Sequence, residues 1–323
     1  MKVLVTGAGG FVGGELVKRL LSLPALGGRA ITQVISLDTR LDEQADPRQV
    51  AVIGSIADRD VLGQALQHAP DCIFHLAAIP GGAVAANYAL GWSVNVEATV
   101  ALFEGLAAQK VPARVVFTSS IGVFGVPLPG DKVDDQTLPL PTMSYGTHKL
   151  IGEALLADFT RRGLLEGVAV RLPGIVARPM VKGGHLSAYM SNIFHALAAG
   201  QAITVPVSRQ ATSWFMSRQR CVDNLLHAAA LPSGSAGARR AFNLPALTLS
   251  MDELVAGIAA HFGPDVARLV SYEPQPAIEA QFGSYPPLLT PIADGLGFEH
   301  DGDAAMLVAR ALDLAPARQG TAP

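Results

Sequence analysis

Cysteine, charge and aromatic residues are scarce in this chain of 323 residues. Only two cysteines occur, Cys72 and Cys221, and no C-x-x-C pair is present. They cannot build a disulfide framework, and both stand in apolar runs that are typical of buried thiols. Charged residues make up 16% of the chain, and the net charge is −3 without a basic stripe. We therefore expect no metal ion, no nucleic acid and no membrane among its partners.

Long uninterrupted hydrophobic runs are also absent. The longest apolar stretch, Cys72–Leu90, contains His75, Pro80 and Asn87, so it predicts a strand, a loop and the start of a helix, not a membrane span. The N-terminal segment reaches a glycine cluster after few apolar residues, and we expect no signal peptide. Half of all residues are hydrophobic, which excludes a disordered chain. We expect a soluble, cytoplasmic protein with a large core.

The first half of the sequence alternates short apolar runs with amphipathic segments. The predicted strands are Lys2–Thr6, Ile31–Leu37, Val50–Ile53, Cys72–Leu76, Arg114–Ser119 and Val168–Leu172. The predicted helices are Phe11–Leu23, a helix capped by Asp58 that reaches about His68, Ala83–Gln109 and Thr142–Arg162. This rhythm indicates β-α-β units, and hence an α/β fold with a Rossmann-type doubly wound parallel sheet.

The second half loses this alternation and becomes rich in proline and glycine. The predicted helices here are Ala188–Ala198, Val222–Ala230, Met251–Phe262 and a last one near Ala304–Leu312. The residues after about Ser271 are expected to be irregular up to the last helix, and Ala315–Pro323 to be a frayed tail.

A glycine-rich loop follows the first predicted strand. Gly7, Gly10 and Gly13 have G-x-x-G-x-x-G spacing and open an amphipathic helix. Glycine lets the chain turn tightly, lets a pyrophosphate approach the backbone and lets a helix pack close to a strand. The helix N-terminus adds free N–H groups and a positive dipole. The context favours dinucleotide binding over a merely tight turn.

The second predicted strand is followed by Asp38, whose carboxylate can accept both ribose hydroxyls of an adenosine. Because it would repel a 2′-phosphate, we expect NAD and not NADP as cofactor. Arg40 could hold such a phosphate, but a solvated surface arginine is the preferred interpretation.

A tyrosine and a lysine stand four residues apart on one predicted helix. Tyr145 and Lys149 therefore share a helix face, and Ser120 follows the fifth predicted strand. A nearby cation favours a phenolate, which can act as a base, and a serine can hold the reacting hydroxyl. His75 could also be taken as catalytic, but a packed, hydrogen-bonded histidine is the simpler interpretation.

With these motifs the chain resembles the extended short-chain dehydrogenase/reductases, the NAD-dependent epimerase/dehydratase group, over about residues 1–245. The resemblance implies that Ser120 is the catalytic serine, Tyr145 the acid/base and Lys149 the lysine that grips the cofactor. Ser55 stands where many members carry an aspartate. The positions expected to contact NAD are Gly7, Gly10, Phe11, Val12, Gly13, Asp38, Ser55, Ile56, Leu76, Ala77, Ala78, Asn95, Tyr145, Lys149 and Pro173.

Departures from the family pattern narrow the range of expected substrates. Ser217 replaces an arginine with which nucleotide-sugar members grip a diphosphate, and the usual asparagine after the sixth strand is missing. Several stretches resemble instead the members that oxidise the 2-hydroxyl of a four-carbon sugar acid. Arg178 is the first choice for the acid's carboxylate, with a structural salt bridge as the alternative. Ser187 and Asn192 could bind its hydroxyls, and Ser120 and Tyr145 its reacting hydroxyl; Trp214 could wall the pocket or lie in the core.

These inferences define an organisation and leave two rival functions. We assign residues 1–179, with returning segments about 214–245, to an NAD-binding Rossmann domain, and residues 180–213 and 246–323 to a smaller C-terminal substrate-binding lobe. The alternatives are a nucleotide-sugar epimerase or dehydratase with tightly bound NAD, and a non-catalytic NAD-binding regulator. Surplus apolar residues on the helices Ala83–Gln109 and Thr142–Arg162 favour a homodimer.

Overall fold

A computed structural model describes residues 1–42, 46–128, 130–180, 186–235, 237 and 241–314. The chain forms two compact units. The first unit comprises Met1–Gly125, Leu138–Leu172 and Val222–Asn243, and the second unit comprises Val126–Thr137, Pro173–Cys221 and Leu244–Pro323. The tail predicted for residues 315–323 lies outside the described residues.

The first unit is built on a seven-stranded sheet in the order β12-β8-β7-β6-β1-β4-β5, in which every neighbouring pair is parallel. Its strands are β1 (Lys2–Thr6), β4 (Gln33–Asp38), β5 (Gln49–Ile53), β6 (Cys72–His75), β7 (Ala113–Ser120), β8 (Leu165–Leu172) and β12 (Ala241–Asn243). The strand order reverses between β1 and β6, and α/β folds bind ligands beyond the carboxyl ends of the strands at such a point. The predicted doubly wound parallel fold is confirmed.

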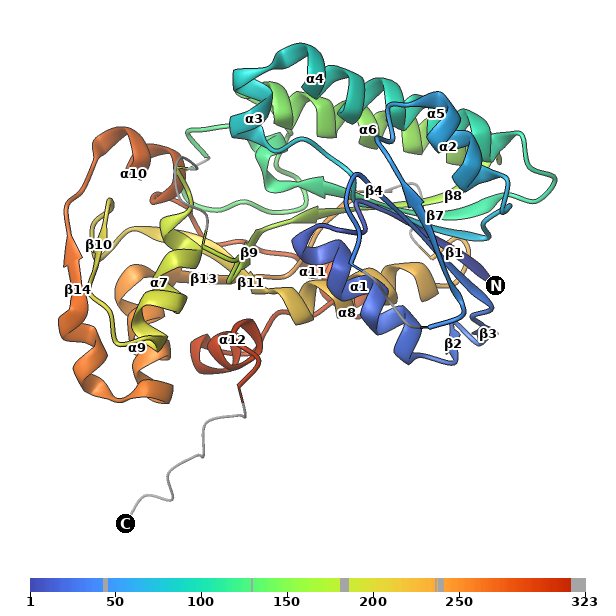
Figure 1. The fold of residues 1–323 in the computed structure, drawn as a ribbon. Helices are drawn as coiled ribbons and strands as arrows, with labels where there is room; N and C mark the ends of the chain where they lie inside the picture. Colours follow the sequence, from blue (N-terminus) through green and yellow to red (C-terminus); the bar gives the residue numbers. More distant parts are fainter. Residues whose placement is uncertain (43–45, 129, 181–185, 236, 238–240, 315–323) are drawn as a thin grey trace. The chain divides into compact units, whose positions relative to one another are not determined.

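Helices cover both faces of this sheet (Figure 1). α1 (Phe11–Ser22) and α8 (Arg218–Ala230) lie on one face, and α5 (Ala98–Ala107) and α6 (Ser144–Arg161) lie on the other. Buried apolar side chains of the strands, such as Ile73 and Phe117, pack with Phe103 and Leu156 in one hydrophobic cluster. Also in this unit are α2 (Arg59–Leu66), α3 (Gly81–Ala86), α4 (Tyr88–Trp92), the π-helix η1 (Ser93–Glu97), the 3-10 helix η2 (Ile121–Phe124), β2 (Ala25–Leu26) and β3 (Arg29–Ala30).

The prediction of one long helix over residues 83–109 is wrong at Asn87. This residue leaves the helical conformation, with a φ of −145° and a ψ of 88°, and its side chain accepts a hydrogen bond from the amide of Leu90 at 3.0 Å. Asparagine competes for backbone groups in this way and favours helix starts over helix interiors. The segment therefore breaks into α3 and a continuous helical run of α4, η1 and α5.

The second unit contains two small sheets. β13 (Leu247–Ser250), β11 (Thr212–Ser217) and β9 (Gly174–Val176) form one, and β10 (Ile203–Val205) and β14 (Val270–Tyr272) form the other. Its helices are α7 (Tyr189–Ala198), α9 (Met251–Phe262), the 3-10 turn η3 (Pro264–Leu269), α10 (Pro276–Phe282), α11 (Pro291–Gly295) and α12 (Ala304–Ala311). The expectation of irregular structure after Ser271 is wrong, because α10 and α11 both begin with a proline, which suits a first helical turn.

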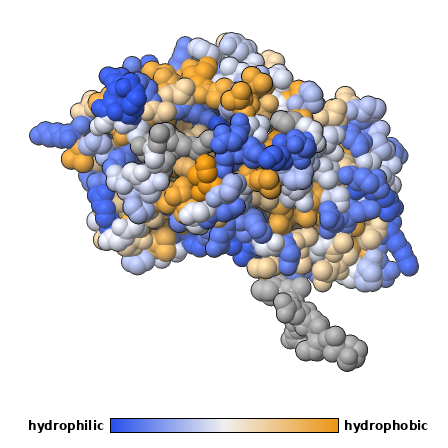
Figure 2. Space-filling model, turned by 180° about the vertical axis from the view of Figure 1, so that it is seen from behind, coloured by the Kyte–Doolittle hydropathy of each residue, from blue (hydrophilic) through white to orange (hydrophobic). Residues whose placement is uncertain are grey.

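Hydrophobic side chains also reach the surface. Figure 2 shows one face of the molecule, on which they lie scattered among hydrophilic ones. Scattered exposure of this kind is usual for folded proteins. Among the described residues, none of the helices combines the length and the hydropathy that crossing a membrane requires.

Candidate active site

The loop between β1 and α1 needs glycine at several positions. Gly7 has a φ of +72°, which side-chain-bearing residues rarely adopt. A Cβ on Gly9 would lie 1.9 Å from the carbonyl oxygen of Arg40, and one on Gly13 would lie 2.0 Å from that of Gly7. α1 begins after Gly10 without a side-chain cap. The loop thus brings a closely packed backbone to the positive end of a helix, the arrangement that binds phosphate groups.

Asp38 ends β4 and connects to this loop. Its Oδ2 accepts a hydrogen bond from the amide of Gly9 at 3.0 Å, and its Oδ1 accepts one from the amide of Thr39 at 2.6 Å. Oδ1 also accepts from Thr39 Oγ1 at 3.1 Å and from the amide of Arg40 at 3.4 Å, so the capacity for a ribose hydroxyl lies at Oδ2, which carries one of these bonds. The predicted neighbours Phe11 and Val12 form the first turn of α1 and are half-buried. This donor and acceptor set fits NAD.

The residues after β6 run beside the glycine loop. A Cβ on Gly7 would lie 2.7 Å from the amide nitrogen of Ala77, and this amide donates to Thr6 Oγ1 at 3.2 Å. The backbone of Leu76 is held too, since its amide donates to the carbonyl oxygen of Thr6 at 3.1 Å. The segment with Leu76, Ala77 and Ala78 is therefore fixed at the point where the strand order reverses.

Three predicted cofactor positions have their side chains engaged within the protein. Asn95 Oδ1 accepts from the amide of Ile79 at 2.7 Å, and its Nδ2 donates to the carbonyl oxygen of Ile79 at 3.0 Å, so Asn95 clamps the segment after β6. Ser55 Oγ accepts from the amide of Ala57 at 3.2 Å. The side chain of Ile56 packs in the hydrophobic cluster of the sheet, which leaves its backbone for a ligand.

His75 is a packed residue, as the simpler interpretation predicted. Its Nδ1 pairs with Thr6 Oγ1 at 2.7 Å and its Nε2 with Thr99 Oγ1 at 2.9 Å. Burial, with a smaller contribution from the charge of Lys149, lowers the pKa of His75 to about 3. The ring therefore stays neutral at physiological pH and serves the core.

Ser120, Tyr145 and Lys149 come together where β7 meets α6. Ser120 ends β7, and its Oγ accepts a hydrogen bond from the amide of Gly122 at 3.1 Å. A Cβ on Gly122 would lie 3.4 Å from Ser120 Oγ and 3.8 Å from Tyr145 Cδ1. The side chains of Ser120 and Tyr145 therefore both lie close to Gly122. Lys149 Nζ lies 5.8 Å from the ring centroid of Tyr145 and donates to the carbonyl oxygen of Thr118 at 2.7 Å.

The ammonium group of Lys149 is buried, with 4% of the residue exposed. Burial lowers the pKa of Lys149 to about 8, while the negative charge of Glu153 acts in the opposite direction. Sequence reasoning missed Glu153. Its position four residues after Lys149, on the same helix face, was the available signal.

Ser120 and Tyr145 belong to the first unit, whereas the other predicted substrate residues, Arg178, Ser187 and Asn192, belong to the second unit. Arg178 is exposed, and its Nε donates to the carbonyl oxygen of Ile175 at 3.3 Å. Within the described part of the chain it forms no ion pair, which removes the salt-bridge alternative there. Ser187 and Asn192 are half-buried at the start of α7, and Pro173 is buried.

Trp214 belongs to the core of the second unit. It is fully buried, and its indole nitrogen donates to the carbonyl oxygen of Pro286 at 2.7 Å. The core alternative for this tryptophan is therefore the one that the structure favours.

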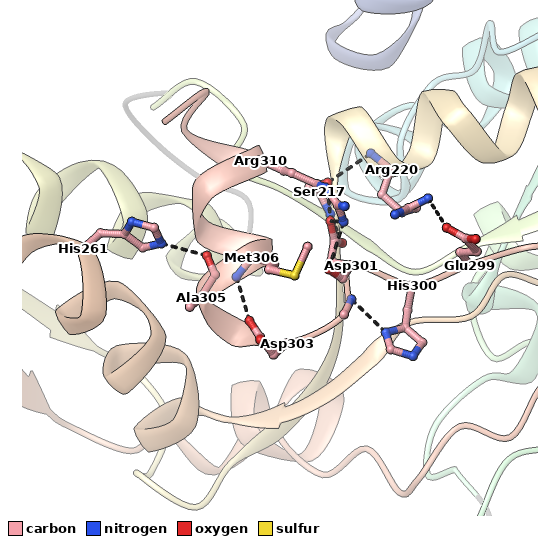
Figure 3. Close-up of polar contacts among 11 residues, drawn as sticks. Ser217, Arg220, His261, Glu299, His300, Asp301, Asp303, Ala305, Met306 and Arg310 are labelled. Atoms are coloured by element: carbon pink, nitrogen blue, oxygen red, sulfur yellow. Dashed lines mark hydrogen bonds and ion pairs between the residues drawn. The ribbon is translucent and has the colours of Figure 1, made fainter. Parts of the chain in front are cut away.

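Ser217, at the position of the missing diphosphate-gripping arginine, is buried and bonded to Asp301 (Figure 3). Its Oγ donates to Asp301 Oδ1 at 2.6 Å, and its amide donates to Oδ2 at 2.8 Å. Ser217 Oγ also accepts from the amide of Arg220 at 3.0 Å, which explains why α8 begins four residues before the predicted Val222. The hydroxyl is thus committed within the protein.

Comparison with known proteins agrees with this geometry. Residues 3–239 match the NAD dependent epimerase/dehydratase family. A D-erythronate dehydrogenase from Cupriavidus necator is 35% identical over 307 residues, which cover 93% of this chain and 94% of that protein. A D-erythronate dehydrogenase from Haemophilus influenzae is 30% identical over 306 residues, covering 94% and 96%.

A solved structure supports the fold as well. The nucleoside-diphosphate-sugar epimerase from Agrobacterium tumefaciens has a TM-score of 0.90 at 29% identity, covering 97% of this chain and 94% of that chain. The fold and the matches define the class: the chain belongs to the NAD-dependent epimerase/dehydratase family. It is an enzyme, and its cofactor is NAD, as predicted.

Proposed function

We propose that this NAD-dependent dehydrogenase oxidises the 2-hydroxyl of a short sugar acid, D-erythronate or a close analogue, to the 2-keto acid. Two relatives that carry the name D-erythronate dehydrogenase match the chain over more than nine-tenths of its length. The observation that carries the proposal is the meeting of Tyr145, Lys149 and Ser120 at the end of β7. These groups supply a base, a cation and a hydroxyl for removing a proton from an alcohol.

In the proposed mechanism the substrate hydroxyl is held by Ser120 and gives its proton to the phenolate of Tyr145. Lys149 supports that phenolate with its positive charge. Because the pKa of Lys149 is about 8, the ammonium form predominates at pH 7. NAD held by the glycine loop and Asp38 would supply the hydride acceptor for the oxidation.

We assign most of the cofactor contacts to the first unit, and the substrate's carboxylate and remaining hydroxyls to residues of the second unit. The glycine loop would hold the pyrophosphate and Asp38 the ribose, with the segment from Leu76 to Ala78 alongside. Asn95 acts by clamping that segment, and Ile56 contributes only its backbone. Pro173 remains a proposed contact. Arg178 would bind the carboxylate of the acid with a planar, bidentate guanidinium, and Ser187 and Asn192 its hydroxyls.

A nucleotide-sugar epimerase or dehydratase is the second candidate, because a structural relative carries the name of a nucleoside-diphosphate-sugar epimerase. The bonds between Ser217 and Asp301 argue against it. A buried hydroxyl that already donates to a carboxylate offers no charge to a diphosphate.

The experiment is to mix the protein with NAD and a panel of four- to six-carbon aldonic acids, and to follow NADH absorbance. D-erythronate and both threonates belong in the panel, with UDP-sugars as controls. A rise with one acid is expected and names the substrate. Conversion of a UDP-sugar without net NADH, and no rise with any acid, would overturn the proposal in favour of the epimerase.

We further propose a homodimer that works in the cytoplasm. Tyr88 and Leu90 of α4 are 55% and 46% exposed, which suits an apolar contact between copies. Cys72 and Cys221 are buried and form no disulfide among the described residues, as expected in a reducing compartment. Light scattering of the purified protein should give twice the chain mass of 33.6 kDa; the monomer mass would contradict the dimer.

A further inference from the structure

A buried carboxylate lies one helical turn beyond Lys149. Glu153 Oε1 accepts hydrogen bonds from Ser119 Oγ at 2.5 Å and from Arg171 Nε at 2.8 Å, and its Oε2 accepts from Arg171 Nη2 at 2.8 Å. The side chains of Glu153 and Arg171 are 6% and 8% exposed. The pair is bidentate and fully enclosed, so its geometry is fixed far more tightly than that of a surface ion pair.

The arginine of this pair reaches two further elements. Arg171 Nη1 donates to Asn243 Oδ1 on β12 at 3.3 Å, and its guanidinium carbon lies 5.2 Å from the ring centroid of Phe124. Phe124 ends η2, the turn that begins directly after Ser120. We call Ser119, Phe124, Glu153, Arg171 and Asn243 the Glu153 network. It joins α6, β7, β8, β12 and η2.

The Glu153 network fixes the register between α6 and the end of β7. Lys149 donates to the carbonyl oxygen of Thr118, and Glu153 accepts from the side chain of the next residue, Ser119. Ser120 then follows. One turn before Lys149, α6 approaches η2 so closely that a Cβ on Gly146 would lie 2.1 Å from a carbonyl oxygen of η2. Successive turns of α6 are therefore tied to successive residues of β7.

The charge of Glu153 also acts on Lys149. Burial disfavours the ammonium form, and Glu153 opposes this effect. The other titratable groups near Lys149 add little charge: His75 on β6 is neutral, and Tyr145 on α6 presents its ring. Arg171 on β8 is paired to Glu153 itself. Glu153 is thus the anion that compensates the buried cation.

We propose that Glu153, held in place by Arg171 and Ser119, is a positioning residue that keeps Lys149 charged and aligned with Tyr145 for proton transfer. The inference rests on the proposed function, since that function gives Lys149 and Tyr145 their roles. In the proposed mechanism Glu153 does not contact the reacting hydroxyl of the substrate. It acts through Lys149.

The decisive experiment compares Glu153→Gln with the native enzyme, both saturated with NAD. Glutamine keeps the size and hydrogen-bonding shape of glutamate but lacks its charge. The chain has six lysines, so carbon-13 labelling of lysine gives a simple spectrum, and Lys149→Arg assigns the signal of Lys149. The titration midpoint of Lys149 should fall by about one unit in Glu153→Gln, which is about tenfold in proton affinity.

Asp301→Asn is the matched control, since Asp301 is another buried carboxylate bonded to a serine and an arginine. It should leave the midpoint of Lys149 unchanged. If Glu153→Gln fails to fold, the double variant Glu153→Met with Arg171→Met removes the pair without stranding an ion. Because the cation of Arg171 is removed as well, the midpoint of Lys149 should fall less than in Glu153→Gln but in the same direction. A folded variant whose Lys149 titrates as in the native enzyme would overturn the inference.

Kinetics separate positioning from a structural role. At pH 8, kcat of Glu153→Gln should drop roughly fivefold with KM for NAD changed less than about twofold, and Glu153→Asp should restore part of kcat. Equal losses in kcat and in folded fraction would indicate structure alone and refute the inference. The lysine titration needs no substrate, so native enzyme that is inactive on every acid would refute the proposed function separately.

Discussion

Buried carboxylates have different neighbours in the two units of the chain. In the first unit Glu153 lies one turn from Lys149, a buried cation whose pKa is lowered to about 8. In the second unit Asp301 is equally buried but bonds the amide and hydroxyl of Ser217 at the start of α8. The comparison shows that two buried carboxylates can have different roles. A carboxylate beside a buried cation controls a protonation state, whereas one at a helix start fixes the backbone.

The largest expected effect is a loss of turnover, and it tests the chemical role assigned to the first unit. Tyr145→Phe removes the proposed base, so kcat with the sugar acid should fall by roughly 10²–10⁴-fold, the usual contribution of general acid–base catalysis. NAD affinity should stay within about twofold of the native value, because the ring remains. NADH absorbance and calorimetric titration with NAD measure the two quantities.

Tyr272→Phe is the control, because the hydroxyl of Tyr272 in the second unit contacts Asp252 at 3.3 Å and has no part in the proposed mechanism. It should retain native turnover. Native turnover in Tyr145→Phe would show that Tyr145 is not the base.

Asp301→Ala tests the second unit. The change strands Ser217, whose amide and hydroxyl lose their acceptor. It also removes the carboxylate 3.3 Å from Arg310, which keeps its bond to the backbone carbonyl of residue 301. Loss of one partner of a buried pair lowers the free energy of unfolding by about 3 kcal/mol or more. Asp303→Ala, which removes only the exposed cap of α12, should lower it by about 1 kcal/mol. Urea unfolding measures the free energy of unfolding of both variants. Equal losses in the two would contradict a larger structural role for Asp301 than for the exposed cap.

A smaller effect is expected from the exposed arginine of the second unit. Arg178→Met should raise KM for the acid by about 10- to 100-fold, the range that corresponds to a charged hydrogen bond, and should leave NAD affinity unchanged. Arg178→Lys should recover part of the loss, since a lysine keeps the charge without the bidentate fork. Initial rates at varied acid concentration provide the test. An unchanged KM would assign the carboxylate to another residue.

Local signals predicted much of the first unit. The strand Lys2–Thr6 was placed correctly because its apolar run and the glycines after it lie within a few residues. The pairing of Tyr145 with Lys149 on one helix followed from spacing alone. The helix over residues 83–109 failed at Asn87, because periodicity averages over many residues whereas a single side chain can break the helix.

Long-range partners set the limit of this reasoning. Glu153 bonds Ser119, 34 residues away, and Ser217 bonds Asp301, 84 residues away. The residues around each carboxylate in the sequence do not indicate its serine partner, because only the folded chain brings carboxylate and serine together. The short strands β9 to β14 were missed for a related reason: segments of three to six residues are too short for alternation to show.

The placement of the two tryptophans gives the molecule its own optical labels. Trp92, half-buried, stacks on Tyr88 in the first unit with ring centroids 6.2 Å apart, whereas Trp214 is fully enclosed in the second. An enclosed indole emits at shorter wavelength than one near water. Fluorescence from Trp92→Phe therefore follows only the second unit, and Trp214→Phe only the first. Overlaid melting curves from the two variants would mean that the units unfold as one cooperative body.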